Sequence, residues 1–132
     1  MGSGILFVSP RREDATLLSR MLGSLSVSIE HVADLKQASV KMQTRSYEVV
    51  FTEANLADGT WLDVLDLARR VAPNSEVIVT DREADARFWA EALNLGAYDL
   101  VAQPFAAAEV QRILGNACSH SLMHPKAIRA TV

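Results

Sequence analysis

The chain has 132 residues and a mass of 14.4 kDa, with 49% hydrophobic and 22% charged residues. This length supports one hydrophobic core and is too short for two comfortable domains. Thirteen Lys and Arg against sixteen Asp and Glu give a formal net charge of −3, which offers no electrostatic reason to expect direct nucleic-acid binding.

The chain has a single cysteine, Cys118, so an internal disulfide is excluded and a reducing, cytoplasmic location is expected. No stretch approaches the length of a membrane span, and the N-terminus lacks the pattern of a signal peptide. His31, His120 and His124 do not follow a metal-ligand spacing with Cys118, so we expect surface or tail histidines. We predict no metal, no cofactor and no membrane partner.

The first third of the chain alternates apolar runs with helical patterns. Residues 4–8, GILFV, predict a buried strand, and apolar residues at helical spacing predict a helix over about 13–22. The alternating pattern over 27–32 predicts a half-exposed strand near a sheet edge. Asp34 is placed to cap the next helix, which runs out before Tyr47.

The middle of the chain contains the stretch VVFTEANLADG. Residues 49–51 predict a strand buried on both faces, and this strand ends at a carboxylate, Glu53. The ADG sequence predicts a turn, and a helix follows over 61–71, before Pro73. The carboxyl ends of strands in open α/β sheets form ligand sites, so Glu53 is the first candidate site residue.

The last part of the chain repeats the alternation. Residues 76–80, EVIVT, predict a strand, and the next helix ends at Gly96. A final strand is predicted over about 98–102, followed by a helix over about 106–118. Five strands alternating with five helices predict a doubly wound α/β fold: a parallel sheet with right-handed crossovers and helices on both faces.

Three fragments resemble one known family. EANLADG at 53–59 resembles the D-x-N-L-P-D-G that follows strand three in the receiver domain of bacterial response regulators, the CheY-like family. VIVT at 77–80 and GAYDLVAQPF at 96–105 resemble the family's V-I-x-x-T and G-A-x-D-Y-L-x-K-P-F. The resemblance implies a flavodoxin-like fold with strand order 2-1-3-4-5. It implies a receiver-like domain at 4–118, with 119–132 as a tail or truncated linker.

The family transfers a phosphoryl group from a histidine kinase to an Asp after strand three, using an acidic pair that holds Mg²⁺, a Thr or Ser, and a Lys. The acceptor position here holds Glu53, the acidic pair falls on Ser9 and Pro10, and the Lys position holds Gln103. Only Thr80 and, by its backbone, Asn55 remain compatible with the family's site. Proline offers no metal ligand and glutamine no positive charge, so the resemblance implies vestigial phosphorylation-site positions and no catalytic residue. We expect the Glu53 carboxylate to be hydrogen-bonded to Thr80, Gln103 or backbone amides.

Two tryptophans depart from the plain pattern. Trp61 stands where the family commonly has Gly, and its indole is expected to cover the pocket mouth or to form a contact surface. In the helix before Gly96, one stripe of residues is predicted to face the core: Phe88, Ala92 and Leu95. The family's partner face combines helix four, strand five and helix five, which implies an interface at Trp89, Leu93 and Leu100. Burial of Trp89 in the core is the open alternative.

The hypothesis that follows is a degenerate receiver, or pseudo-receiver, within a two-component signalling protein. Such a domain would be a phosphorylation-independent interaction or dimerisation module and not an enzyme. Its partner would be a signalling protein, a fused effector domain or a second copy. One alternative is a receiver phosphorylated at a non-standard acid, Glu53 or Asp58. Another is a small flavodoxin-like cofactor-binding protein or phosphatase, although SPRREDAT after the first strand has neither a glycine-rich phosphate loop nor D-x-D.

Overall fold

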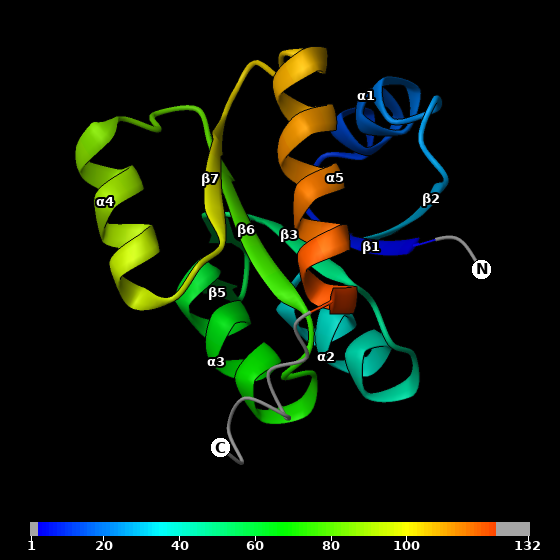
Figure 1. Cartoon of the computed structure of the whole chain (residues 1–132). Coiled ribbons are helices and arrows are strands. Elements are labelled where there is room, and N and C mark those ends of the chain that lie inside the picture. The colour runs from blue at the N-terminus through cyan, green and yellow to red at the C-terminus, as the bar shows by residue number, and fades with distance from the viewer. Residues whose placement is uncertain (1–2, 124–132) are drawn as a thin grey trace.

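The apolar runs form the centre of the protein as a parallel sheet. The computed structural model describes residues 3–123. The sheet contains β1 (Ser3–Val8), β2 (Val27–Val32), β3 (Val49–Glu53), β6 (Glu76–Asp81) and β7 (Asp99–Ala102). The strands lie in the order β2-β1-β3-β6-β7 (Figure 1). Counted within this sheet alone, that is the predicted 2-1-3-4-5 order of a flavodoxin-like fold.

Helices cover both faces of the sheet, as predicted. They are α1 (Arg12–Met21), α2 (Leu35–Thr44), α3 (Trp61–Val71), α4 (Ala86–Leu95) and α5 (Ala107–Met123). Residues of α2, α3 and α4 pack in a core on one face, and residues of α1 and α5 pack on the other. In the described part of the chain, no helix is long and apolar enough to cross a membrane.

The central strand β3 contributes to both halves of the core. Val50 packs with the α2, α3 and α4 side, while Val49 and Phe51 pack with the α1 and α5 side. All three side chains are fully buried. Side chains alternate along a strand, so covering both faces requires an unbroken apolar run, which is what the sequence provides.

Short polar side chains and one glycine set the helix ends. Asp34 Oδ1 accepts a hydrogen bond from the Gln37 amide at 2.9 Å, which satisfies one free donor at the start of α2. Gly96 closes α4 with φ of 114°, a left-handed conformation that favours glycine. Both positions were predicted from sequence, and the structure confirms them.

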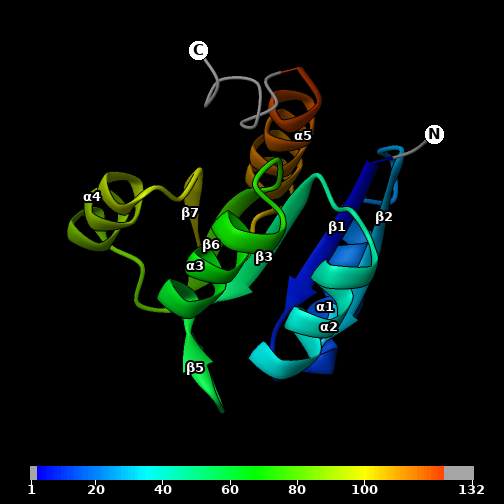
Figure 2. The ribbon, with the colours of Figure 1, turned by 90° about the horizontal axis from the view of Figure 1, so that it is seen from below.

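The turn between β3 and α3 is more ordered than predicted. It forms an antiparallel ribbon of β4 (Asn55–Leu56) and β5 (Gly59–Thr60), and Figure 2 shows β5 outside the main sheet, beside the start of α3. Between these strands, Asp58 accepts hydrogen bonds from the amides of Leu35 at 2.9 Å and Lys36 at 3.1 Å. These bonds to backbone amides lower the pKa of Asp58. The ribbon therefore caps α2 from a distant part of the sequence.

Two expectations about apolar side chains are wrong. Trp61 is only 5% exposed and packs against Phe88 with ring centroids 5.9 Å apart, so it neither covers a pocket mouth nor forms a contact surface. The Trp61 side chain, at the start of α3, faces inward toward Phe88 of α4. Leu95, predicted in the core stripe, is 42% exposed. It is the last residue of α4, a helix in which only Ala92 is fully buried.

Helix α5 is longer than predicted. It continues past residue 118 to Met123, so residues 119–123 are helical and the predicted tail is wrong there. His120 Nδ1 bonds with the buried carboxylate of Glu76, and Ser121 Oγ donates to the Asn74 carbonyl. These contacts attach the last turn of α5 to the sheet, which contradicts a surface or tail role for His120. The remaining predicted tail, 124–132, lies outside the described residues.

We expect Trp61→Ala to lower the free energy of unfolding by about 3–5 kcal/mol, because it removes a buried indole and leaves a cavity. Trp89→Ala is the matched control: Trp89 is 48% exposed, and its removal is expected to cost about 1 kcal/mol, chiefly a hydrogen bond to Asp99. Urea unfolding followed by circular dichroism measures both variants. Equal losses would contradict the placement of the two rings.

Candidate functional site

The carboxyl ends of the central strands bring together four of the predicted site residues. Glu53 ends β3, Ser9 follows β1, and Thr80 lies near the end of β6. Gln103 follows β7 and precedes Pro104 through a cis peptide bond. In a parallel sheet these ends lie at one edge, so residues far apart in sequence form one polar site.

Neutral donors hold the Glu53 carboxylate. Its Oε2 accepts from Gln103 Nε2 at 2.9 Å and from Ser9 Oγ at 3.3 Å. Gln103 Nε2 also lies 3.2 Å from Thr80 Oγ1, which itself donates to the Val101 carbonyl at 2.8 Å. Gln103 therefore bridges Glu53 and Thr80, and the expected contact of Glu53 with Thr80 is indirect.

The environment of Glu53 favours its protonated form more than water does. Partial burial raises the pKa of Glu53, and the hydrogen bond from Gln103 opposes this shift. The negative charge of Asp14 raises the pKa further, while the Ser9 hydroxyl and the Arg11 charge lower it. The net direction is upward, because burial penalises the charged carboxylate most.

Asp14 is the site residue that the sequence comparison missed. It lies in the first turn of α1 and not directly after β1, where the family's acidic pair falls. Its Oδ2 atom is buried and has no hydrogen-bond partner among the described residues. The sequence does show an acidic residue in the first turn of the helix after the first strand. Only the fold shows that the charge of this residue acts on Glu53.

The residues present do not fit a magnesium site of the family's kind. The Ser9 hydroxyl donates to Glu53, and the Pro10 side chain has no ligand atom. Within residues 3–123, no group of three or more His, Cys, Asp or Glu side chains gathers in a metal-binding arrangement. Mg²⁺ prefers an octahedral set of oxygen ligands, and the carboxylates near this edge are too few to anchor one as the family does.

A cavity of about 460 Å³ lies beside the site. Its lining joins α1, the loop after β6 and the loop after β7, with these residues: Asp14, Leu17, Arg82, Gln103, Pro104 and Phe105. The lining combines three apolar residues with Asp14, Arg82 and Gln103, and Gln103 is also the residue that donates to Glu53. The cavity thus touches the site through Gln103.

The residues implied for a partner face differ in their exposure. Trp89 is 48% exposed and its indole N–H donates to Asp99 Oδ1 at 2.9 Å, which rules out the core alternative for this ring. Leu93, one turn further along α4, is half-buried. Leu100 is only 8% exposed and packs in the core, so its prediction as an interface residue is wrong. The strand β7 turns Leu100 toward α4 and away from solvent.

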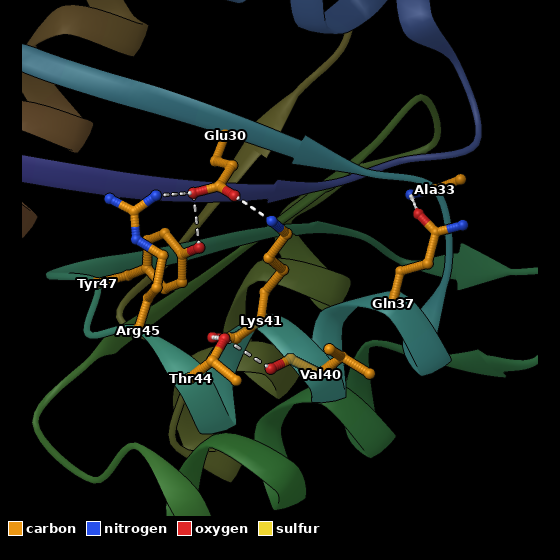
Figure 3. A network of polar contacts seen from close by, with 8 residues as sticks. All are labelled: Glu30, Ala33, Gln37, Val40, Lys41, Thr44, Arg45 and Tyr47. Atoms are coloured by element: carbon orange, nitrogen blue, oxygen red, sulfur yellow. Dashed lines mark hydrogen bonds and ion pairs between the residues drawn. The ribbon is translucent and has the colours of Figure 1, made fainter.

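A second polar network lies between β2 and α2 (Figure 3). Glu30 pairs with Lys41 at 2.6 Å and Arg45 at 2.9 Å, and it accepts from the Tyr47 hydroxyl at 2.8 Å. The Lys41 hydrogen bond is the largest cause that lowers the pKa of Glu30, and burial raises the pKa of Tyr47 to about 12. The groups satisfy one another, so this network attaches α2 to the sheet edge.

The architecture and the polar edge define a class of protein: a five-stranded parallel α/β domain with an acidic residue at the end of its central strand and a threonine on the next one. Residues 5–114 match the family described as the response regulator receiver domain, and the chain belongs to this family. No curated protein matches the chain.

Solved receiver domains share the fold at low sequence identity. The signal receiver domain of an HD domain-containing protein from Pseudomonas fluorescens Pf-5 is 22% identical, with a TM-score of 0.83 over 94% of this chain and 100% of that one. The receiver domain of sensor histidine kinase PA1611 from Pseudomonas aeruginosa, with magnesium coordinated in its active site cleft, is 26% identical, with a TM-score of 0.77 over 90% and 99%. The beryllofluoride-activated NtrC4 receiver domain dimer is 20% identical, with a TM-score of 0.81 over 89% and 98%.

Glu53→Gln is expected to change how stability depends on pH. The pKa of Glu53 is raised by folding, so its stabilising proton is fully present below the unfolded pKa and is lost as pH rises through the folded pKa. Above that pKa, the variant should therefore be more stable than the parent, because glutamine stays neutral and still accepts hydrogen bonds. Urea midpoints from about pH 4 to about pH 8 measure the difference. Glu13→Gln, on the exposed face of α1, is the control, and identical profiles for Glu53→Gln and the parent would contradict the shift.

Proposed function

We propose that this receiver domain works as a degenerate receiver, a protein-interaction module that acts without phosphoryl transfer. One observation carries the proposal: the carboxylate at the end of β3 is held by two neutral side chains, Ser9 and Gln103. In the family's reaction, a metal ion and a lysine occupy the same surroundings and offset the charge of the transferring group. The domain would accordingly transmit a signal by contact and not by catalysis.

The geometry of Glu53 adds support. Its side chain is one methylene longer than that of the family's aspartate, and Oε2 already accepts two hydrogen bonds. An attack by this carboxylate would meet an incoming phosphate with no cation from residue 103 and with one of its two oxygens already occupied. Positioning and charge compensation account for most of the catalysis of phosphoryl transfer, so their loss leaves little reactivity.

Phosphorylation at Asp58 is the alternative that the ribbon makes less favourable. Both carboxylate oxygens of Asp58 accept amides at the start of α2, from Leu35 and Lys36. Reaction at this carboxylate would disrupt these two hydrogen bonds at the start of α2 and leave only the cap from Asp34. Asp58 therefore supports the fold, and we favour a structural role for it.

A contact surface on α4 supports the choice of an interaction module. The Trp89 ring is 48% exposed beside β7, while the other tryptophan is buried. Large exposed aromatic side chains are frequent anchors of protein interfaces. The occupant of this surface would be a signalling protein, a fused effector domain or a second copy, and the receiver dimer formed by NtrC4 makes self-association the first to test.

Beryllofluoride with Mg²⁺ tests the loss of phosphoryl chemistry. We expect the amide resonances of Glu53, Thr80 and Gln103 to stay unmoved, because the site lacks metal ligands and a lysine. The matched control carries Ser9→Asp, Pro10→Asp, Glu53→Asp and Gln103→Lys, which restore the family's residues and should restore a response. Saturable shifts in the parent protein would overturn the proposal.

Sedimentation velocity over a range of concentrations tests the α4 surface. If the domain self-associates there, Trp89→Ala should weaken association by about tenfold or more, since anchor residues contribute most of the binding energy. Leu62→Ala is the control, because Leu62 is 46% exposed on a different helix, α3. An unchanged distribution for Trp89→Ala, or a parent that stays monomeric throughout, excludes this homodimer.

A further inference from the structure

A groove with a volume of about 440 Å³ lies between α2 and α3. Its lining residues come from 35–40 of α2, from Asp58 in the ribbon and from 63–70 of α3, and we call it the α2–α3 groove. Six of its nine lining residues are exposed, so it is open to solvent. Sites for small molecules enclose most of the ligand surface. An open groove between two helices is better suited to side chains of another protein.

Apolar side chains form part of the groove. Leu67 is only 6% exposed and packs in the core, Leu35 packs against that core from α2, and Val40 is 58% exposed. Ala38 and Met42 are the residues of α2 that are buried, so Val40 lies on the opposite side of this helix. Covering an exposed apolar side chain is favourable, and the groove therefore gains free energy when a partner contacts Val40.

The charges around these apolar side chains are mostly negative. Three carboxylates line the groove, Asp58, Asp63 and Asp66, against two cations, Lys36 and Arg70. Arg70 Nε already pairs with Asp66 Oδ2 at 3.1 Å. Asp58 and Asp63 accept hydrogen bonds from backbone amides, and within residues 3–123 neither forms an ion pair. Bonds from those amides lower the pKa of Asp58, so this carboxylate stays ionised at neutral pH.

The fold holds one end of the groove in place. Asp58 binds amides at the start of α2, and the Thr60 amide donates to Asp63 Oδ2 at 2.9 Å in the capping box of α3. Gly59 lies between them, where an added Cβ would come within 2.8 Å of Asp63 Oδ2 and 2.9 Å of Leu35 Cδ2. The ribbon, α2 and α3 thus meet at close range. A partner that binds here does not have to order the groove first, which lowers the cost of binding.

We propose that the α2–α3 groove binds a helix of a partner protein that carries large apolar side chains between lysines or arginines. The apolar side chains would cover Val40 and Leu35, and the basic ones would compensate Asp58 and Asp63. Residues 63–70 rise by about 10 Å along α3, and over this length a partner helix presents two side chains one turn apart. Amphipathic helices bind apolar grooves in this way, and charge complementarity selects among them.

This surface goes beyond the proposed function. The α2–α3 groove shares no residue with the polar site around Glu53 or with the α4 surface around Trp89. Its partner can bind whether or not the domain transfers a phosphoryl group. The two proposals can therefore fail separately.

NMR titration of the full chain with two synthetic peptides tests the proposal. Both peptides are about 14 residues long, enough to form a helix, and carry leucines at helical spacing. Lysines fill the other positions of the first peptide, and glutamates fill those of the second. We expect only the lysine peptide to bind saturably, with the largest amide shifts at Ser39, Val40 and Asp66. Added salt should weaken this binding, because it screens exposed charges.

Two exposed positions provide the variants, each with a matched control. Val40→Ser should weaken binding of the lysine peptide by about tenfold or more, because it removes the apolar anchor. Leu62→Ser is its control, since Leu62 is 46% exposed on α3 and does not line the groove. Asp66→Lys should weaken binding by about threefold or more, and Glu13→Lys makes the same charge change on the exposed face of α1.

Several results would overturn the proposed partner. The lysine peptide might cause no saturable shift, its shifts might centre on α4 or on Glu53, or the glutamate peptide might bind equally well. Equal losses for Val40→Ser and Leu62→Ser, with amide spectra of folded proteins, would also contradict it. All these results leave the proposed function standing, whereas a response to beryllofluoride removes the proposed function and leaves the groove.

Discussion

Burial of β3 on both faces is the constraint on which the rest of the structure depends. Val49, Val50 and Phe51 have no exposed surface, so helices must cover the sheet on both sides. Parallel pairing with β1 and β6 then places all the strand ends that carry polar residues at one edge. The position of Glu53 follows from this packing, because it is the first residue of the strand that is not fully enclosed.

This edge of the sheet has the arrangement of a receiver site, but its charges differ from those of a site built for phosphoryl transfer. A site built for phosphoryl transfer concentrates positive charge around an ionised aspartate. Here Gln103 links Glu53 and Thr80 through its neutral amide group, and the charge that acts most strongly on Glu53, that of Asp14, is negative. Such surroundings raise the pKa of Glu53 and so favour its neutral form more than water does, which is the opposite of what an anionic acceptor requires.

Two connections show how distant parts of the chain stabilise this arrangement. Asp58 in the ribbon after β3 caps α2, and the last turn of α5 bonds to the start of β6 through His120 and Glu76. Neither contact follows a local sequence pattern. The sequence of the ribbon predicts a turn. It does not predict that the Asp58 carboxylate accepts hydrogen bonds from α2, a helix that lies before β3 in the chain.

The sequence by itself determined the order of strands and helices, the cap at Asp34, the left-handed turn at Gly96 and the family resemblance, because these depend on local periodicity and on backbone conformation. Only the tertiary structure decided which side chains are buried and which titratable groups meet. It placed Trp61 and Leu100 in the core, left Trp89 exposed, and brought Asp14 toward Glu53. The reason is physical: helical spacing defines the faces of a helix, but packing against the sheet and its neighbours selects the face that is covered.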